Sequence, residues 1–177
     1  MSEKNTDREK LRHLSYAGMF AALTALLTAL LHIPVTNGYV HCGDAVIYLA
    51  AALLPLPYAV GASAVGGMLA DLISGYPAYA LPTFLIKGML AAAFSLTGGK
   101  ELLCFRRFAG MVLCGIISVL GYWVTAVFLY GGWRTQFAVT VPGNLMQAAA
   151  SAAVYSAAAL ALMRTRNRRP DDPAQMR

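Results

Sequence analysis

Charged residues are scarce in this chain. Asp, Glu, Lys and Arg together make up 12% of its 177 residues, whereas 58% of the residues are hydrophobic. An average globular domain contains about 25% charged residues, which help to cover its apolar core with polar surface. Long apolar runs are instead typical of helices that cross a lipid bilayer. The composition therefore predicts a multi-pass membrane protein and argues against a single soluble domain.

Cysteines and the common catalytic motifs are also few or missing. The three cysteines, Cys42, Cys104 and Cys114, are scattered and odd in number, unlike a disulfide framework or a metal site. His32 and His41 have no third ligand nearby in the sequence, so we expect no bound metal. The chain has no GxxxxGK[ST] phosphate loop, no HExxH and no GxSxG motif. We therefore expect that it does not hydrolyse ATP by itself and that it has no catalytic residues.

Six apolar segments are separated by proline, glycine or short polar stretches. They cover residues 14–33, 44–56, 58–73, 82–96, 108–130 and 143–163. The first, fifth and sixth approach the roughly 20 residues that span a bilayer, and the shorter ones are joined by tight turns. Pro82 is expected at the first position of the fourth helix, and Pro142 with Gly143 at the start of the sixth. The pattern predicts an all-α membrane protein, a compact bundle of six transmembrane helices.

Lysine and arginine cluster before the first segment, between the fourth and fifth, and after the sixth. The positive-inside rule then places both termini in the cytoplasm. The net charge of +6 is explained by this membrane topology, so it does not indicate binding to nucleic acid. We divide the chain into a mobile cytoplasmic N-terminal tail (1–13), a six-helix transmembrane substrate-binding domain (14–163) and a basic cytoplasmic C-terminal tail (164–177). The connections 34–43, 74–81 and 131–141 would then face outward.

Three ionisable residues, Asp44, Asp71 and Lys87, lie near or inside the apolar segments toward this outer side. Charges at membrane depth are costly and usually face a cavity or each other. Asp44 could simply stabilise the start of the second helix, where a carboxylate meets the positive end of the helix dipole. Asp71 and Lys87 could form an ion pair that fixes the third helix against the fourth. Alternatively, one or more of the three could contact a polar solute that enters from outside.

The outer connections contain many aromatic and amide side chains, which bind flat polar molecules. Asn144 and Gln147 are three residues apart at the start of the sixth segment and share a face, where they line a site or bond to another helix. An interfacial aromatic belt is the alternative for the aromatic residues, and it is the expected role of Tyr58, Tyr122 and Trp123. The substrate-binding candidates are Asn37, Tyr39, His41, Asp44, Asp71, Tyr76, Tyr79, Lys87, Trp133, Asn144 and Gln147.

A stripe of alanines runs along the first segment. Ala17, Ala21, Ala25 and Ala29 repeat every four residues, a spacing that lets another helix approach closely. This alanine stripe is a candidate surface for a partner helix, and packing inside the bundle is the alternative.

Four motifs follow one another along the chain in a characteristic order. They are Gly43-Asp44, then Asp71 with Gly75 and Tyr76, then Pro82, Thr83 and Lys87, and finally Pro142, Gly143, Asn144 and Gln147. Because of these motifs and their order, the chain resembles the S components of energy-coupling factor (ECF) vitamin transporters, in particular the riboflavin-type subgroup. The resemblance extends from about Tyr16 to Met163. The resemblance also includes the alanine stripe, which is similar to the family's surface for its coupling subunit.

The resemblance implies a substrate-binding subunit in a prokaryotic plasma membrane and not an enzyme. Its partners would be the lipid bilayer, a transmembrane T coupling subunit and two ATPase subunits, which alone would use ATP. The ligand would be a vitamin or precursor of the riboflavin, pyridoxine, thiamine pyrimidine or benzimidazole type, held under the connection between the first two helices. No covalently bound cofactor is expected. The alternatives are a stand-alone carrier or channel that uses an Asp71/Lys87 pair, and a small intramembrane enzyme, for which a convincing nucleophile and base are missing.

Overall fold

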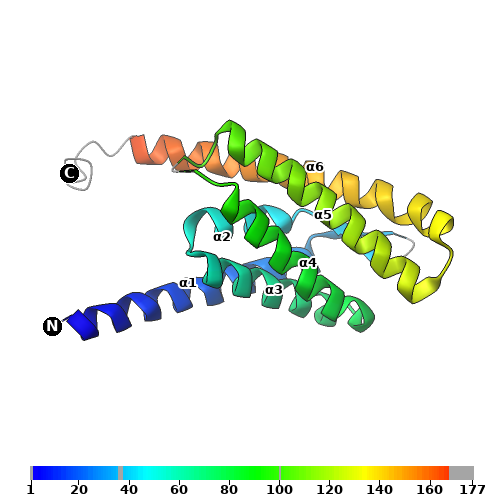
Figure 1. Cartoon of the computed structure of the whole chain (residues 1–177), viewed down its shortest axis with the longest axis horizontal. Helices are drawn as coiled ribbons and strands as arrows, with labels where there is room; N and C mark the ends of the chain where they lie inside the picture. Colours follow the sequence, from blue (N-terminus) through cyan, green and yellow to red (C-terminus); the bar gives the residue numbers. More distant parts are fainter. Residues whose placement is uncertain (1, 36–37, 100, 168–177) are drawn as a thin grey trace.

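The computed structural model describes residues 2–35, 38–99 and 101–167 of the chain. This part consists of six helices and one β-hairpin (Figure 1). In chain order the elements are α1 (Ser2–Leu30), β1 (His32–Val35), β2 (Gly38–His41), α2 (Asp44–Leu53), α3 (Leu56–Ile73), α4 (Pro77–Leu96), α5 (Phe105–Tyr130) and α6 (Trp133–Asn167). The predicted all-α membrane class therefore holds for the six helices, and the hairpin is an addition to it.

The hairpin forms most of the connection between the first two helices. Its strands are antiparallel, with His32 opposite His41 and Ile33 opposite Val40. Tyr39 and His41 point to the same face because side chains alternate along a strand. The hairpin thus carries two of the predicted binding residues toward the helices.

The fourth helix begins at Pro77, so the prediction that Pro82 is its first residue is wrong. Gly75 adopts a positive φ of 83°, which completes the turn after α3 within three residues. Pro77 then occupies the start of α4, where a missing N–H has no cost. Pro82 lies inside the helix. As a result, Tyr79 belongs to a helix and not to the connection.

The sixth helix also begins earlier than predicted, at Trp133, so the expected connection 131–141 is mostly helical. Gly131 and Gly132 both have a φ of 71°, a conformation that glycine adopts without strain, and they make the turn alone. Pro142 therefore lies inside α6 and does not open it. Proline is tolerated inside membrane helices because neighbouring groups can satisfy the carbonyl that it leaves free.

Helix α1 begins at Ser2, well before the predicted start at residue 14. The stretch before residue 14 is rich in Glu, Lys and Arg, which have good helix propensity. The ion pair between Lys10 and Asp7, with 3.9 Å between Nζ and Oδ1, is exposed and adds little stability. The division of the chain into tails and a membrane domain stays a prediction.

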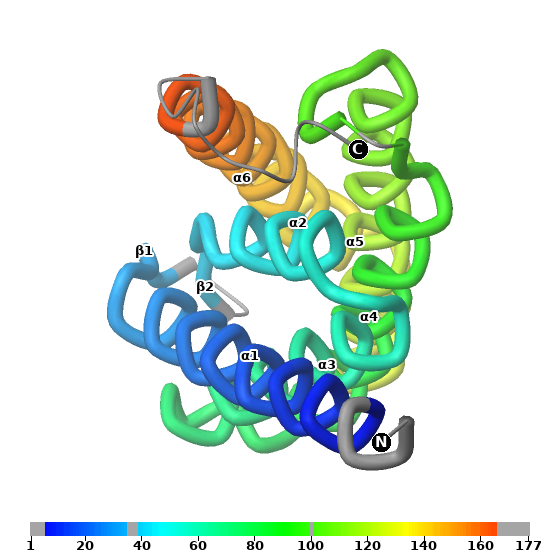
Figure 2. The backbone as a smooth tube through the Cα atoms, turned by 90° about the vertical axis from the view of Figure 1, so that its left-hand side faces the viewer, coloured from blue at the N-terminus to red at the C-terminus, as the bar shows by residue number. Residues whose placement is uncertain are grey.

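Five helices are long and apolar enough to cross a membrane, namely α1, α3, α4, α5 and α6. Helix α2 has only 10 residues, or about 15 Å of helix, against a hydrocarbon core about 30 Å thick. It contacts α1, α3, α4 and α6 and lies among the longer helices (Figure 2). The N-terminal end of α1 and the C-terminal end of α6 lie at one end of the bundle, and the hairpin lies toward the other (Figure 1).

An aromatic cluster forms the core between α2, α4 and α6. The rings of Tyr48 and Phe94 stack with centroids 4.8 Å apart, and Tyr155 meets the edge of Phe94 at 5.2 Å. Tyr155 also donates a hydrogen bond of 2.6 Å to the carbonyl of Leu102. This cluster anchors α2 to the two helices whose other ends line the pocket described below.

The alanine stripe packs inside the bundle. Ala17, Ala25 and Ala29 are buried, and Ala21 is half-buried. Helix α1 lies against α3, and a Cβ added to Gly66 of α3 would stand only 2.7 Å from the carbonyl oxygen of Ala21. This placement corresponds to the internal-packing alternative. A partner-binding role of the four alanines stays a prediction, and it would require α1 to move away from α3.

Candidate functional site

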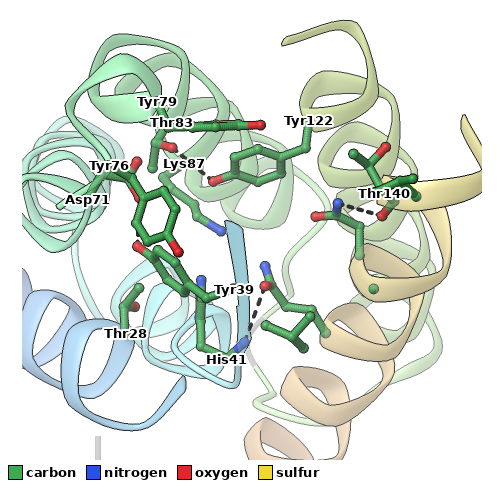
Figure 3. Close-up of a pocket in the computed structure, with 15 residues that line it drawn as sticks. Thr28, Tyr39, His41, Asp71, Tyr76, Tyr79, Thr83, Lys87, Tyr122 and Thr140 are labelled. Carbon is green, nitrogen blue, oxygen red and sulfur yellow. Dashed lines mark hydrogen bonds between the residues drawn. The ribbon is translucent and has the colours of Figure 1, made fainter. Parts of the chain in front are cut away.

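A pocket lies between the hairpin and five of the helices. Its walls come from the C-terminal part of α1, strand β2, the α3–α4 turn, and helices α3, α4, α5 and α6 (Figure 3). The lining residues are Thr28, Tyr39, Val40, His41, Asp71, Tyr76, Tyr79, Thr83, Lys87, Tyr122, Val139, Thr140, Gly143, Asn144 and Gln147. The space open to the centres of water molecules is about 60 Å³, which is enough for a few waters.

A buried ion pair closes the inner side of the pocket. Lys87 Nζ donates to Asp44 Oδ1 at 2.5 Å, and both side chains are 1% exposed. Gln147 Nε2 donates to the other carboxylate oxygen of Asp44 at 3.0 Å, and the backbone N–H of His41 donates to Gln147 Oε1 at 3.4 Å. The network therefore connects α2, α4, α6 and β2. Both oxygens of Asp44 have partners, as a buried carboxylate requires.

Of the alternatives for Asp71 and Lys87, an ion pair between the two is contradicted, because Lys87 pairs with Asp44. Gly67 makes this possible, since a Cβ there would stand 2.7 Å from Lys87 Cγ. The lysine stem passes over the glycine and reaches the start of α2. Asp44 uses its oxygens for Lys87 and Gln147, whereas the alternative expectation was that it stabilises the helix end. A stand-alone carrier gated by an Asp71/Lys87 pair loses its structural basis.

Asp71 takes part in a separate contact. Its Oδ1 accepts a hydrogen bond of 2.6 Å from the Tyr39 hydroxyl, and the residue is 5% exposed. Within the described ranges, its Oδ2 has no hydrogen-bond partner, although the Thr83 hydroxyl is a neighbour. Burial and the adjacent Asp71 carboxylate raise the pKa of Tyr39, so this hydroxyl stays protonated and donates. Asp71 is thus a buried carboxylate with one oxygen still available.

His41 is a neutral side chain at the pocket wall. Burial, followed by the nearby Lys87 ammonium, lowers its pKa from 6.5 to about 3. Its Nδ1 accepts a hydrogen bond of 2.9 Å from the backbone N–H of Gly43. The neutral ring therefore carries its proton on Nε2. Gly43 is required at this approach because an added Cβ would overlap the Thr28 hydroxyl and crowd the His41 ring.

Aromatic rings surround the polar groups. Tyr39 lies between Tyr76 and His41, with centroid distances of 5.3 and 5.6 Å, respectively. The Lys87 ammonium lies 5.2 Å from the centroid of the Tyr122 ring. The Tyr122 hydroxyl is 3.2 Å from Thr83 Oγ1. Aromatic side chains in a pocket wall are suitable contacts for an aromatic ligand.

Most of the predicted binding residues meet at this pocket. The eight that line it are Tyr39, His41, Asp71, Tyr76, Tyr79, Lys87, Asn144 and Gln147. Asp44 lies behind Lys87 and reaches the pocket through it. Trp133 does not belong to the lining; it is 60% exposed, and its carbonyl accepts a hydrogen bond from Trp123 Nε1. Asn37 falls outside the described residues. Their role in binding a ligand stays a prediction.

Sequence reasoning missed several lining residues. Tyr122 was expected in an interfacial aromatic belt, but its ring is part of the pocket wall. Thr28, Thr83 and Thr140 also line the pocket. Threonine hydroxyls are common in membrane helices, so only Thr83, which stands between Pro82 and Lys87 in the quoted motif, had a signal in the sequence. Among the described residues, no three His, Cys, Asp or Glu side chains come together as a metal site.

Comparison with known sequences gives a family match over most of the chain. The family described as "ECF-type riboflavin transporter, S component" matches residues 8–164, which is most of the chain. The chain is also similar to a Pyrococcus woesei protein described as "Uncharacterized protein in gap 3'region". The two are 40% identical over 99 residues, which cover 56% of this chain and 66% of the other. The first match covers the hairpin, the pocket and the six helices, apart from the first residues of α1 and the last residues of α6.

Proposed function

Because the chain belongs to the ECF-type riboflavin transporter S component family, we propose that it captures a vitamin or vitamin precursor outside the cell for ATP-driven import. S components are transport subunits and not enzymes, and the chain is a multi-pass protein of the plasma membrane. The observation that carries the proposal is the pocket of buried polar groups and aromatic rings under the hairpin. A few convergent polar groups in an apolar surround are typical of small-molecule sites.

We further propose that the chain spans the membrane six times, with both termini in the cytoplasm. The clusters of Lys and Arg before α1, between α4 and α5, and after α6 support this orientation. The start of α1 and the end of α6 lie at one end of the bundle (Figure 1). The hairpin and pocket then face outward.

Delivery into the cell requires partners. A transmembrane T subunit and two ATPase subunits would supply the energy, because the chain has no phosphate-binding loop of the usual kind. Docking of the T subunit on the alanine stripe is part of this proposal. Since α3 covers that stripe here, docking there would have to follow a separation of α1 from α3.

Ligand capture can be tested without the partners. The purified chain in detergent is expected to retain a heteroaromatic compound that mass spectrometry identifies, or to bind one of the candidate vitamins at micromolar concentration. Replacing the half-buried Tyr76 with Ala should weaken binding by about tenfold, because the ligand loses a ring face. Trp133→Ala is the matched control, since Trp133 lies outside the pocket. Binding of none of these vitamins would overturn the proposal.

A further inference from the structure

One carboxyl group of the pocket, that of Asp71, has no cation within salt-bridge distance among the described residues. Lys87 is the one cation among the described residues that line it, and the Asp44 carboxylate neutralises this ammonium at 2.5 Å. His41 is neutral, as described above. Among the described residues, Asp71 forms no salt bridge, and its Oδ1 accepts a hydrogen bond from the Tyr39 hydroxyl. With Asp71 ionised, the three groups Asp44, Lys87 and Asp71 together carry a net charge of about −1.

Asp71 can also accept one more hydrogen bond. Tyr39 occupies Oδ1, whereas Oδ2 is buried without a partner in the part of the chain that the structure describes. A buried acceptor without a partner is unfavourable, and a donor brought by a ligand removes this penalty. Bonds to an ionised acceptor are also stronger than those between neutral groups.

The neighbouring groups restrict the shape of the donor. Tyr39 and Tyr76, which lie against each other at 5.3 Å, are close to Asp71 at one side of the pocket (Figure 3). The Tyr122 ring forms another wall of the pocket, and its hydroxyl lies 3.2 Å from Thr83 Oγ1 (Figure 3). A flat ring can lie between these faces with an N–H or amino group at its edge. Aromatic faces also attract a positive charge on that ring.

We propose that Asp71 sets the specificity of this pocket for a flat heteroaromatic ligand with a donor group, neutral or cationic, and that it rejects ligands carrying a carboxylate. This inference rests on the proposed function. A carboxylate on the ligand would face Asp71 with no free cation to balance it, because Lys87 already belongs to Asp44. Arg134 cannot take that role, since it lies over the ring of the exposed Trp133 outside the pocket.

Matched ligand pairs test the proposal. We would measure the affinity of the purified full chain for hydroxymethylpyrimidine and its ring carboxylate, and for pyridoxine and pyridoxic acid. Riboflavin serves as a larger neutral ligand with an imide N–H. We expect at least one donor-bearing neutral ligand to bind, and its carboxylate counterpart to bind about 100-fold more weakly. This comparison needs no mutant.

The variant Asp71→Asn adds a second measurement. It should bind the preferred ligand about tenfold more weakly and should lose most of the discrimination against the carboxylate. Arg134→Gln, which removes a charge outside the pocket, should change neither. Equal or tighter binding of the carboxylates by the wild-type chain would overturn the inference while the proposed function stands. Unchanged discrimination in a folded Asp71→Asn variant would do the same. If no ligand of the panel and no other candidate vitamin binds, and no heteroaromatic compound co-purifies, the proposed function itself fails, and the inference with it.

Discussion

The buried pair of Asp44 and Lys87 should contribute a large coupling energy to the stability of the bundle. The variants Asp44→Asn and Lys87→Met each remove one charge and leave its partner buried without compensation. Both side chains are 1% exposed, so solvent cannot replace the lost contact. Asp44 also accepts from Gln147, which means that the network joins three helices and would loosen as a unit.

The magnitude has an upper limit, because a buried orphan charge can neutralise itself. Neutralising an ordinary lysine at pH 7, with a pKa of about 10.4, costs about 4.6 kcal/mol, and an ordinary aspartate costs about 4.2 kcal/mol. Each single variant should therefore lose about 3–5 kcal/mol, which matches the range known for broken buried pairs. The double variant leaves no buried charge and should lose only about 1–3 kcal/mol.

The assay is a double-mutant cycle on the free energy of unfolding. Unfolding by sodium dodecyl sulfate in mixed micelles, followed by far-UV circular dichroism, supplies the four values. A second cycle with Asp71→Asn and Lys87→Met is the control, since the structure pairs Lys87 with Asp44. A coupling below about 0.5 kcal/mol for Asp44 and Lys87, or a larger one for Asp71 and Lys87, would refute the assignment.

Two further changes have defined outcomes. Gly66→Ala should destabilise the chain by about 1–3 kcal/mol, because the new Cβ would stand 2.7 Å from the Ala21 carbonyl oxygen and 2.9 Å from Thr24 Cβ. Gly61→Ala in the same helix should not, since nothing lies within 4 Å of its added Cβ, and equal effects in the same unfolding assay would contradict the close packing of α1 on α3. The pKa of His41 is lowered to about 3, so the unfolded chain binds a proton below pH 6.5 that the folded chain does not. Its share of stability is therefore present above pH 6.5 and falls by about 1.4 kcal/mol per pH unit on acidification. His41→Gln should lack this component when unfolding is compared at pH 7 and pH 5, and an identical pH dependence would show that His41 is not buried in a neutral form.

The sequence predicted the helices well but not their ends. Apolar runs with few charges indicated six helices, and all six are present in the described chain. The starts of α4 and α6 were misplaced because each region offers more than one turn signal. Pro77 and Pro82 both suit a helix start, and only the positive φ of Gly75 decides between them. In the same way, the positive φ angles of Gly131 and Gly132 place the turn before Trp133, so α6 does not begin at Pro142.

The hairpin had a signal that composition concealed. Asn37-Gly38 is a common dipeptide at hairpin turns, but it stands between short strands in a chain dominated by helical apolar runs. The partner of Lys87 had no comparable signal. Asp71 is nearer in sequence, and the choice of Asp44 depends on how α2 sits and on the space above Gly67. Such choices are made by tertiary packing and not by local sequence.

The bonds of the hairpin have a kinetic consequence. Strand β2 contacts Asp71 through Tyr39 and Gln147 through the His41 N–H, and these are groups that a ligand in the pocket would meet. A ligand that enters under the hairpin must wait until these contacts open. The observed rate of association would then level off at high ligand concentration, at the opening rate of the hairpin. The association rate constant would stay below the diffusion limit. Dissociation would pass through the same opening step, so capture and retention of the ligand would share one barrier.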